Sequence, residues 1–431
     1  MSLKFAATGD TIITCPYTRD YEGYEALAAW LRQADVRMNN METPLADGPC
    51  PVSAFSGRPW MRGKTALLDE LADFGFNCYS FANNHGLDYF YPGLLSTMEA
   101  FESRGLAYAG AGRDLESASG HCLIRTPEGT VAFLAIATSQ ETSMMAGTGG
   151  RDILPRPGVN LLRHTIRCRV TKEQMEELQA IADSCKINSR LKNRMKLGSV
   201  SLSDGIFPFG TTEFEVGEPG RFTFPNPYDM ERMEAAVKKA AAEADRTVVY
   251  IHSHETKGDS DAEPDWFAEE FARRAVDWGA DAVVGSGTHQ VKGVEFYRGR
   301  PIFYGIANFV FRPFDMDEYP NEWYELYRMD KSLTPREAED IRTKHGTRGL
   351  VTQRYAYRSV IPLLTWEGEK LSVKAYPISL GFDDGPETRG FPRPASPDDR
   401  AALLEALQEL SRPYGTAVKI DQDGLFTFEE G

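Results

Sequence analysis

The sequence lacks several features that would assign it to a whole class of proteins. Its six cysteines are scattered and include no CxxC pair, so neither a disulfide framework nor a thiolate metal site is indicated. No run of about eighteen apolar residues occurs, and the first residues show no basic segment followed by an apolar one. These absences predict a cytoplasmic protein with free thiols and no membrane anchor.

Positive charge is also scarce. The chain has 48 Lys and Arg against 63 Asp and Glu, a formal net charge of −15. Nucleic acids and anionic membranes attract basic surfaces, so neither is expected as a partner. One segment departs from this balance, because eleven Lys or Arg lie between Arg151 and Lys196 against five Asp or Glu. It is either a solvated helical insertion or a rim that attracts an anionic substrate, which Arg163 and Arg167 would then bind.

Short apolar runs alternate with amphipathic stretches through the first half of the chain. Strand-like runs at 3–9, 34–40, 76–82 and 106–110 are separated by helix-like stretches at 21–33, 65–75 and 92–105. A further helix is expected to begin after Asp265 and to end at Gly279, which suit the two cap positions. This alternation predicts an α/β fold with crossover helices.

Two segments interrupt the alternation. The first, about 145–225, carries a helix whose start at Thr171 fits a capping box with Gln174. The second, 311–348, reads as a long loop with one short helix, and either segment could act as a lid. Strands at 360–366 and 370–376 follow, and the tail reads as a helix and a short strand. We expect one main domain over residues 1–350, which residues 351–431 complete.

Polar side chains follow the predicted strands at the points where those strands end. This is the edge at which open α/β sheets bind ligands. Two carboxylates, an amide and several imidazoles together suit a borderline divalent ion such as Zn, Mn, Fe or Co. The strand-end residues are Asp10, Glu42, Asn83, Asn84, His85, His252, His254 and His289.

Each of these residues also has an ordinary structural interpretation. Asp10 could cap a helix or serve a turn, and the two asparagines could serve a turn. His252 and His254 face the same side only if their strand stays extended. His254 could belong to the site or merely support it. His121, His164 and His345 are given no role.

The same stretches resemble a known family. GD at 9–10, NMETPL at 40–45, ANNHGLDYFYPGLLSTMEAFESRGLAYAGAG at 82–112, and the block from HSHE at 252 to IANFVF at 311 look like the CapA family. This family of capsule or poly-γ-glutamate biosynthesis proteins is itself similar to calcineurin-like metallophosphoesterases. The resemblance implies a metallophosphoesterase-like α/β sandwich, here with a helical insertion and additional C-terminal strands.

The resemblance also implies roles for single residues. Asp10 matches the aspartate ligand of the first strand, and Glu42 stands where those enzymes have a metal-bridging aspartate. Asn84 matches the ligand of the Asn-His motif, whereas His85 matches its catalytic histidine. The later histidine ligands are matched by His252 and His289.

Two positions depart from the family pattern. Ile12 stands where a phosphoesterase has a histidine, and Ser286 stands where CapA relatives usually carry one. Each half of a two-metal site thereby loses an imidazole. We therefore expect one tightly bound divalent ion, or two weakly bound ions, rather than a well-formed two-metal centre, which weakens the case for in-line phosphoester hydrolysis.

Three functions remain open on these grounds. The first is a metal-dependent hydrolase of a γ-glutamyl or acidic peptide, or of a phosphoester-type substrate, with Asn83 among the substrate contacts. The second is a peptide Cα epimerase without an organic cofactor, in which Asp10 and His289 act from opposite faces. The third is a non-catalytic protein that binds poly-γ-glutamate. For an enzyme, the predicted catalytic residues are Asp10, His85, His254 and His289.

Overall fold

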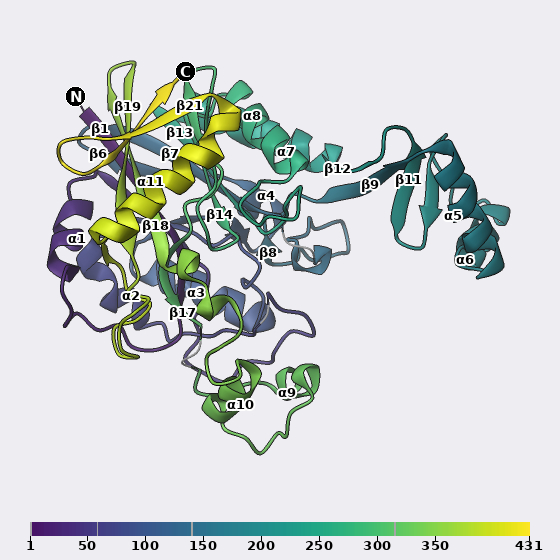
Figure 1. Cartoon of the computed structure of the whole chain (residues 1–431), viewed down its shortest axis with the longest axis horizontal. Helices are drawn as coiled ribbons and strands as arrows, with labels where there is room; N and C mark the ends of the chain where they lie inside the picture. Colours follow the sequence, from purple (N-terminus) through teal and green to yellow (C-terminus); the bar gives the residue numbers. More distant parts are fainter. Residues whose placement is uncertain (1, 58, 139–140, 314–315) are drawn as a thin grey trace.

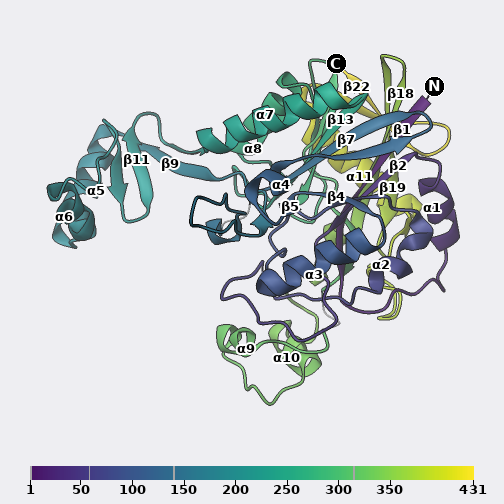
Figure 2. The same ribbon diagram turned by 180° about the vertical axis from the view of Figure 1, so that it is seen from behind.

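The computed structural model describes residues 2–57, 59–138, 141–313 and 316–431. Two large sheets pack face to face in the main body, and helices lie along their outer sides (Figure 1, Figure 2). The mixed α/β class predicted from the sequence is confirmed. The narrower likeness to metallophosphoesterases and the division into domains stay predictions.

The larger sheet has ten strands and a parallel half that carries the N-terminal part of the chain. β1 lies at its centre: the parallel strand β2 pairs along one side of it, and on the other side the antiparallel β18 pairs with its first half and the parallel β17 with its last residues. The strands of this sheet are β1 (Ser2–Ile13), β2 (Val36–Met41), β3 (Cys78–Ser80), β4 (Ala107–Ala109), β17 (Asn308–Arg312), β18 (Arg358–Glu367), β19 (Lys370–Ser379), β20 (Arg393–Pro394), β21 (Thr416–Ile420) and β22 (Phe426–Glu430).

The second sheet has six strands. Successive side chains along these strands face two different hydrophobic cores. Phe133 and Tyr250 face the larger sheet, where Phe133 stacks on Phe5 with 6.4 Å between ring centroids. Leu134 and Val249 face the opposite way, toward α7 and α8. Because side chains alternate along a strand, His252 faces the same side as Tyr250, toward β1. The strands are β6 (Cys122–Thr126), β7 (Gly129–Ala137), β13 (Arg246–Ser253), β14 (Ala282–Gly287), β15 (Val294–Tyr297) and β16 (Arg300–Phe303).

The helices of the body follow the predicted pattern with one correction. α8 is capped by Asp265 as expected. The single helix predicted over 65–75 is wrong, because that stretch forms only α2 and a separate 3-10 turn at Ala72–Phe74. The helices are α1 (Tyr24–Leu31), α2 (Leu67–Glu70), α3 (Phe90–Ser103), α4 (Leu115–Ser119), α7 (Pro227–Glu243), α8 (Trp266–Asp277) and α11 (Pro397–Ser411). None of the described helices is long and apolar enough to cross a bilayer.

The insertion forms an arm that projects from the body (Figure 1). Its stem is the antiparallel pair of β9 and β12, and Thr171 caps α5 through the predicted box with Gln174. A second helix and a four-stranded sheet were not predicted. The arm contains β9 (His164–Val170), α5 (Lys172–Ser184), α6 (Ser189–Lys196), β10 (Phe207–Phe209), β11 (Thr212–Val216) and β12 (Gly220–Pro225). A short pair, β5 (Ala111–Gly112) and β8 (Gly158–Val159), lies at its base.

A second excursion leaves the larger sheet after β17 and returns to it before β18. It holds two helices, α9 (Asn321–Tyr327) and α10 (Pro335–Arg342), where one had been predicted. Its two ends meet, because the Asn308 side chain in β17 donates a hydrogen bond to the Ala356 carbonyl at 2.9 Å. A stacked pair, Tyr319 and Trp323, forms its own small core together with Trp60. The chain then ends in α11 and the hairpin β21–β22, where one strand had been predicted.

Candidate metal centre

The strand-end residues meet at one edge, between the two sheets. Asp10 lies near the end of β1, Glu42 directly follows β2, and His252 lies near the end of β13. Two groups of potential ligands form there, Asp10–Glu42–His252 and Glu42–His254–His289, and the ligand atoms of each group lie within 4.8 Å of one another. The sequence-predicted residues are thus brought together, and Glu42 belongs to both groups.

Asp10 is fully buried and held from several sides. The Ser286 hydroxyl donates a hydrogen bond to Oδ1, Asn40 Nδ2 donates to the same oxygen at 2.8 Å, and the Gly287 amide donates to Oδ2 at 3.1 Å. Gly287 has φ +125°, and a Cβ there would lie 2.3 Å from the Ser253 carbonyl oxygen, so only glycine brings this amide so close. Burial opposes ionisation of Asp10, but His252, His289 and Ser286 outweigh it and hold its pKa well below the ordinary value.

Glu42 presents the opposite situation. It is fully buried, and neither carboxylate oxygen has a hydrogen-bond partner in the described part of the chain. Its Oε1 lies 3.6 Å from His252 Nε2 and 4.0 Å from both His254 Nε2 and His85 Nε2. Burial, followed by the charge of Asp10, raises the pKa of Glu42 well above its ordinary value. A buried carboxylate without donors is costly unless a cation compensates it.

The imidazoles lie around the same point. His252 Nε2 lies 2.8 Å from Asn84 Oδ1 and 3.2 Å from His254 Nε2. Burial is the first cause that lowers the pKa of both His254 and His289, which favours the neutral ring that binds metals. His289 adopts a left-handed backbone, φ +57°, and its Nδ1 lies 2.9 Å from Asn308 Oδ1. Such strained positions occur most often at functional sites.

His85 forms a dyad with a residue that the sequence analysis did not single out. Its Nδ1 lies 2.7 Å from Asp88 Oδ2, and Asp88 also accepts hydrogen bonds from the backbone amides of Gly57 and Met61 at 3.1 and 2.9 Å. A Cβ on Gly57 would lie 2.6 Å from His85 Nε2, so the loop passes directly over the ring. The dyad fixes the orientation of the imidazole beside Glu42.

Asn83 was predicted to contact substrate. Its side chain is fully buried, donates to the Met41 carbonyl at 2.9 Å and accepts from the His85 amide at 3.1 Å. Both ends of its amide therefore hold the loop that carries Asn84 and His85. Its contact with a substrate stays a prediction.

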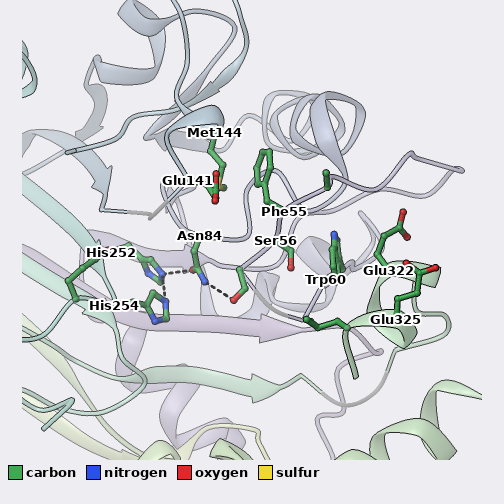
Figure 3. Close-up of a pocket in the computed structure, with 14 residues that line it drawn as sticks. Phe55, Ser56, Trp60, Asn84, Glu141, Met144, His252, His254, Glu322 and Glu325 are labelled. Carbon is green, nitrogen blue, oxygen red and sulfur yellow. Dashed lines mark hydrogen bonds between the residues drawn. The ribbon is translucent and has the colours of Figure 1, made fainter. Parts of the chain in front are cut away.

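A cavity of about 700 Å³ opens from the imidazoles. Figure 3 shows His252, His254 and Asn84 at one end and Glu322 and Glu325 at the other, with Phe55 and Trp60 on the path between them. The described lining residues are Ala54, Phe55, Ser56, Gly57, Trp60, Asn84, Glu141, Met144, His252, His254, Glu255, Glu322, Glu325 and Leu326. The metal centre is therefore accessible to a ligand of moderate size.

The two arginines predicted to bind substrate lie outside this lining. Arg163 forms a bidentate ion pair with the buried Asp229, at 2.8 and 2.9 Å, and Arg167 pairs with Glu213 and Glu215 on β11. Arg163 lines a second cavity of about 920 Å³ that shares only Glu255 with the first among the described residues. The charges of both arginines are thus already partnered within the protein.

Sequence comparison places this geometry in a family. Residues 4–313 match the family described as bacterial capsule synthesis protein PGA_cap. The chain belongs to the PGA_cap family. The matched stretch contains every strand-end residue of the centre and stops just before the excursion that carries α9.

Three relatives are similar to this PGA_cap chain. It is 30% identical to the uncharacterized protein y4sH of Sinorhizobium fredii, over 97% of this chain and 92% of that protein. It is 27% identical to a probable polyglutamine synthesis accessory protein of Mycobacterium tuberculosis, over 66% of this chain and 58% of the relative. It is also 22% identical to the capsule biosynthesis protein CapA of Bacillus anthracis, over 68% of this chain and 54% of the relative.

Several members of this PGA_cap site were missed from the sequence. Asn40 and Asn308 lie beside Asp10 on β2 and β17, and Ser286 lies beside His252 on β14. Asn40 and Ser286 could have been predicted from the register of parallel strands. Each lies at the end of a strand that was itself predicted. The signal for Asp88 is its position, because this carboxylate lies only three residues after His85 in the sequence.

Proposed function

We propose that this protein is a metal-dependent hydrolase that cleaves an amide or ester bond in a peptide. The observation that carries the proposal is Glu42, a buried carboxylate without hydrogen-bond donors that faces His252, His254 and His85 at 3.6–4.0 Å. An isolated buried carboxylate is stable only when protonated or paired with a cation. Imidazole nitrogens directed at it favour the cation.

The donor set fits a divalent ion of borderline softness. Ligands of one such ion, each about 2.0–2.3 Å from it, lie roughly 3–4 Å from one another. The spacings of 2.8 Å from His252 Nε2 to Asn84 Oδ1 and 3.6 Å to Glu42 Oε1 agree with this. Glu42, His252, Asp10 and Asn84 would hold a Mn, Zn, Fe or Co ion, with His254 and His289 as additional donors.

A bound ion of this class polarises a carbonyl group and makes water more acidic. The protein's own residues supply positioning and proton transfer. His85, which Asp88 orients, transfers the proton of the hydrolysis through its Nε2 atom. This nitrogen faces Glu42 across 4.0 Å. The substrate lies in the cavity with its reacting bond at the imidazole end. The loop at Gly57 covers His85 and limits the access of bulk water.

The residues at the two positions that depart from the family pattern, Ile12 and Ser286, favour one bound ion over two. Ile12 is buried and has no donor atom, and the Ser286 hydroxyl is already engaged by Asp10 and Tyr250. Neither position adds an imidazole to the two groups that share Glu42. A second ion would therefore bind more weakly than the first.

Metal analysis of purified protein is the first test. We expect one equivalent of bound metal in the wild type and its loss in both Asp10→Ala and His289→Ala. The matched control is His345→Ala, because His345 is exposed and pairs with Asp340 at 2.6 Å. A wild type that binds neither Mn nor Zn would overturn the proposal and favour a binding protein.

The epimerase alternative is separable by its product. Asp10 Oδ2 lies 3.6 Å from His289 Nδ1, so these two groups form a pair and do not face each other across a substrate-sized gap. The geometry therefore favours hydrolysis. With peptide substrate in D₂O, hydrolysis yields two fragments, whereas epimerisation leaves the peptide intact with deuterium at Cα. If the peptide stays intact and gains deuterium at Cα, the hydrolase proposal is wrong and the epimerase alternative is supported.

A further inference from the structure

The cavity walls are acidic, although an anionic substrate was expected from the sequence. Four glutamates line the cavity, Glu141, Glu255, Glu322 and Glu325, and no lysine or arginine occurs among the lining residues that the structure describes. The chain has 48 Lys and Arg, so an opening of this size without one is informative. The glutamates at both ends of this cavity would repel an anionic chain.

Glu255 is the member that cannot be explained as an ordinary surface acid. It is 8% exposed, and its Oε2 accepts hydrogen bonds from the Thr138 and Ser253 hydroxyls. Its Oε1 has no hydrogen-bond partner in the part of the chain that the structure covers. The Lys292 ammonium is near enough for charge interaction but donates its hydrogen bond to the Glu263 carbonyl, at 3.4 Å. One carboxylate oxygen of Glu255 is thus buried without a hydrogen-bond donor where this residue borders the cavity.

The glutamates at the far end belong to α9 and are exposed. Within the described residues Glu322 forms no ion pair, whereas Glu325 lies 2.6 Å from the ammonium of Lys331. Both line the cavity and lie beyond Trp60 from the imidazoles (Figure 3). The matched family stretch ends at residue 313, so Glu322 and Glu325 lie outside it.

The middle of the cavity is apolar and aromatic. Phe55, Trp60, Met144 and Leu326 contribute to it, and the Trp60 indole nitrogen donates to the Ser53 carbonyl at 2.9 Å, which fixes the ring. Aromatic faces attract ammonium and guanidinium groups and also accept apolar side chains. The walls therefore suit a ligand with an apolar or aromatic part next to a cation.

We propose that the substrate is a cationic peptide whose lysine or arginine side chain, or free amine, is bound by Glu322 and Glu325. This inference rests on the proposed function for the position of the reacting bond, which lies at the imidazole end. The aromatic middle holds the neighbouring residue of the peptide. Glu255 accepts a hydrogen bond from the peptide near the metal centre.

Binding of three matched peptides tests the inference separately from catalysis. The probes are acetyl-Phe-Lys-amide, acetyl-Phe-Gln-amide and acetyl-Phe-Glu-amide, and their affinities for chelator-treated protein are measured by ligand-observed NMR. Two exposed ion pairs of ordinary strength predict that the Lys peptide binds about tenfold more tightly than the Glu peptide. The preference should shrink as salt is raised, because exposed charges are screened.

The decisive variant is Glu322→Gln/Glu325→Gln, which should abolish the preference. Its matched control is Glu405→Gln/Glu409→Gln, which removes the same charge from exposed positions of α11 and should keep it. Equal affinities for the three peptides, or no binding at millimolar concentration, would overturn the inference, as would a preference that survives in the α9 variant. A preserved preference without hydrolysis by the Mn-loaded protein would reject the proposed function but support the cationic ligand.

Discussion

The two ends of the cavity are built in opposite ways. At the metal centre, Asp10, Glu42 and His252 are buried side chains at strand ends, and two packed sheets fix their positions. At the far end, Glu322 and Glu325 are exposed side chains on a short helix in an excursion outside the sheets. The comparison teaches that the sheet edge holds the candidate ligands, whereas a segment added to the sheets supplies the acidic end of the cavity.

The cost of a change should differ accordingly. At the candidate metal centre Asp10 and His289 are held by partners that are themselves buried, Ser286 behind Asp10 and Asn308 behind His289, and Glu42 is itself fully buried. At the far end, Glu325 has one exposed partner and Glu322 has none among the described residues. Substitutions should therefore be severe at the first end and graded at the second.

The largest effect, a loss of metal affinity, is expected from Glu42→Gln at the buried end of the cavity. Even residues that only support metal ligands change affinity by about 10–100-fold, so loss of an anionic ligand should exceed that. The metal-dependent rise in melting temperature should disappear, while the metal-free variant should be at least as stable as the metal-free wild type. Calorimetry with and without Mn measures both, with Glu270→Gln on the exposed side of α8 as the control. Unchanged metal affinity would contradict the assigned role of Glu42.

A smaller effect, about a hundredfold in turnover, is expected from Asp88→Asn. The amide cannot stabilise the His85 imidazolium, but the ligands of the metal are untouched, so bound metal should stay at the wild-type level. Asp340→Asn is a matched control, because it alters an exposed aspartate–histidine pair with His345. Loss of metal in Asp88→Asn would show that the dyad supports the centre structurally and does not transfer protons.

A modest gain is expected at the exposed end from Lys331→Gln. Lys331 neutralises Glu325 at 2.6 Å, so its removal frees this carboxylate for a ligand. Affinity for acetyl-Phe-Lys-amide should rise about two- to threefold, within the range of one exposed ion pair. Affinity for acetyl-Phe-Gln-amide provides the reference, and an equal rise for both peptides would contradict the explanation by charge.

The smallest effect is expected in the arm. Arg167→Gln should change the affinity of acetyl-Phe-Glu-amide less than about twofold, because this guanidinium is already paired with Glu213 and Glu215. The same NMR titration measures it, beside wild type. A tenfold loss of affinity would restore the basic insertion as the site that attracts an anionic substrate.

The buried end could be predicted from the sequence because parallel strands place their ends at one edge. Asp10 and His252 each followed a recognisable apolar run, and the register of β13 then turned His252 toward β1. The exposed end could not be predicted. Glu322 and Glu325 lie in a polar segment without strand or helix periodicity long enough to orient them, and only the fold brings them opposite Phe55.

The arm shows a second limit of the same kind. Its excess of Lys and Arg was counted over residues 151–196, but the partners of Arg163 and Arg167 lie outside that range, on α7 and on β11 of the arm itself. Asp229 on α7 meets Arg163 across 66 residues, and Glu213 on β11 meets Arg167 across 46. Charge composition of a segment indicates a binding surface only when its partners lie outside the chain.

The closed ends of the excursion between β17 and β18 have a consequence for how such proteins diversify. Because Asn308 ties the start of the segment to Ala356 at its end, the whole stretch can be exchanged or lengthened without moving either strand. Loop-closure entropy grows only slowly with length, so a replacement of different size costs little stability. We therefore expect the segment to be exchangeable as a unit, and grafting it onto the sheet edge of a relative would test whether the proposed substrate preference moves with it.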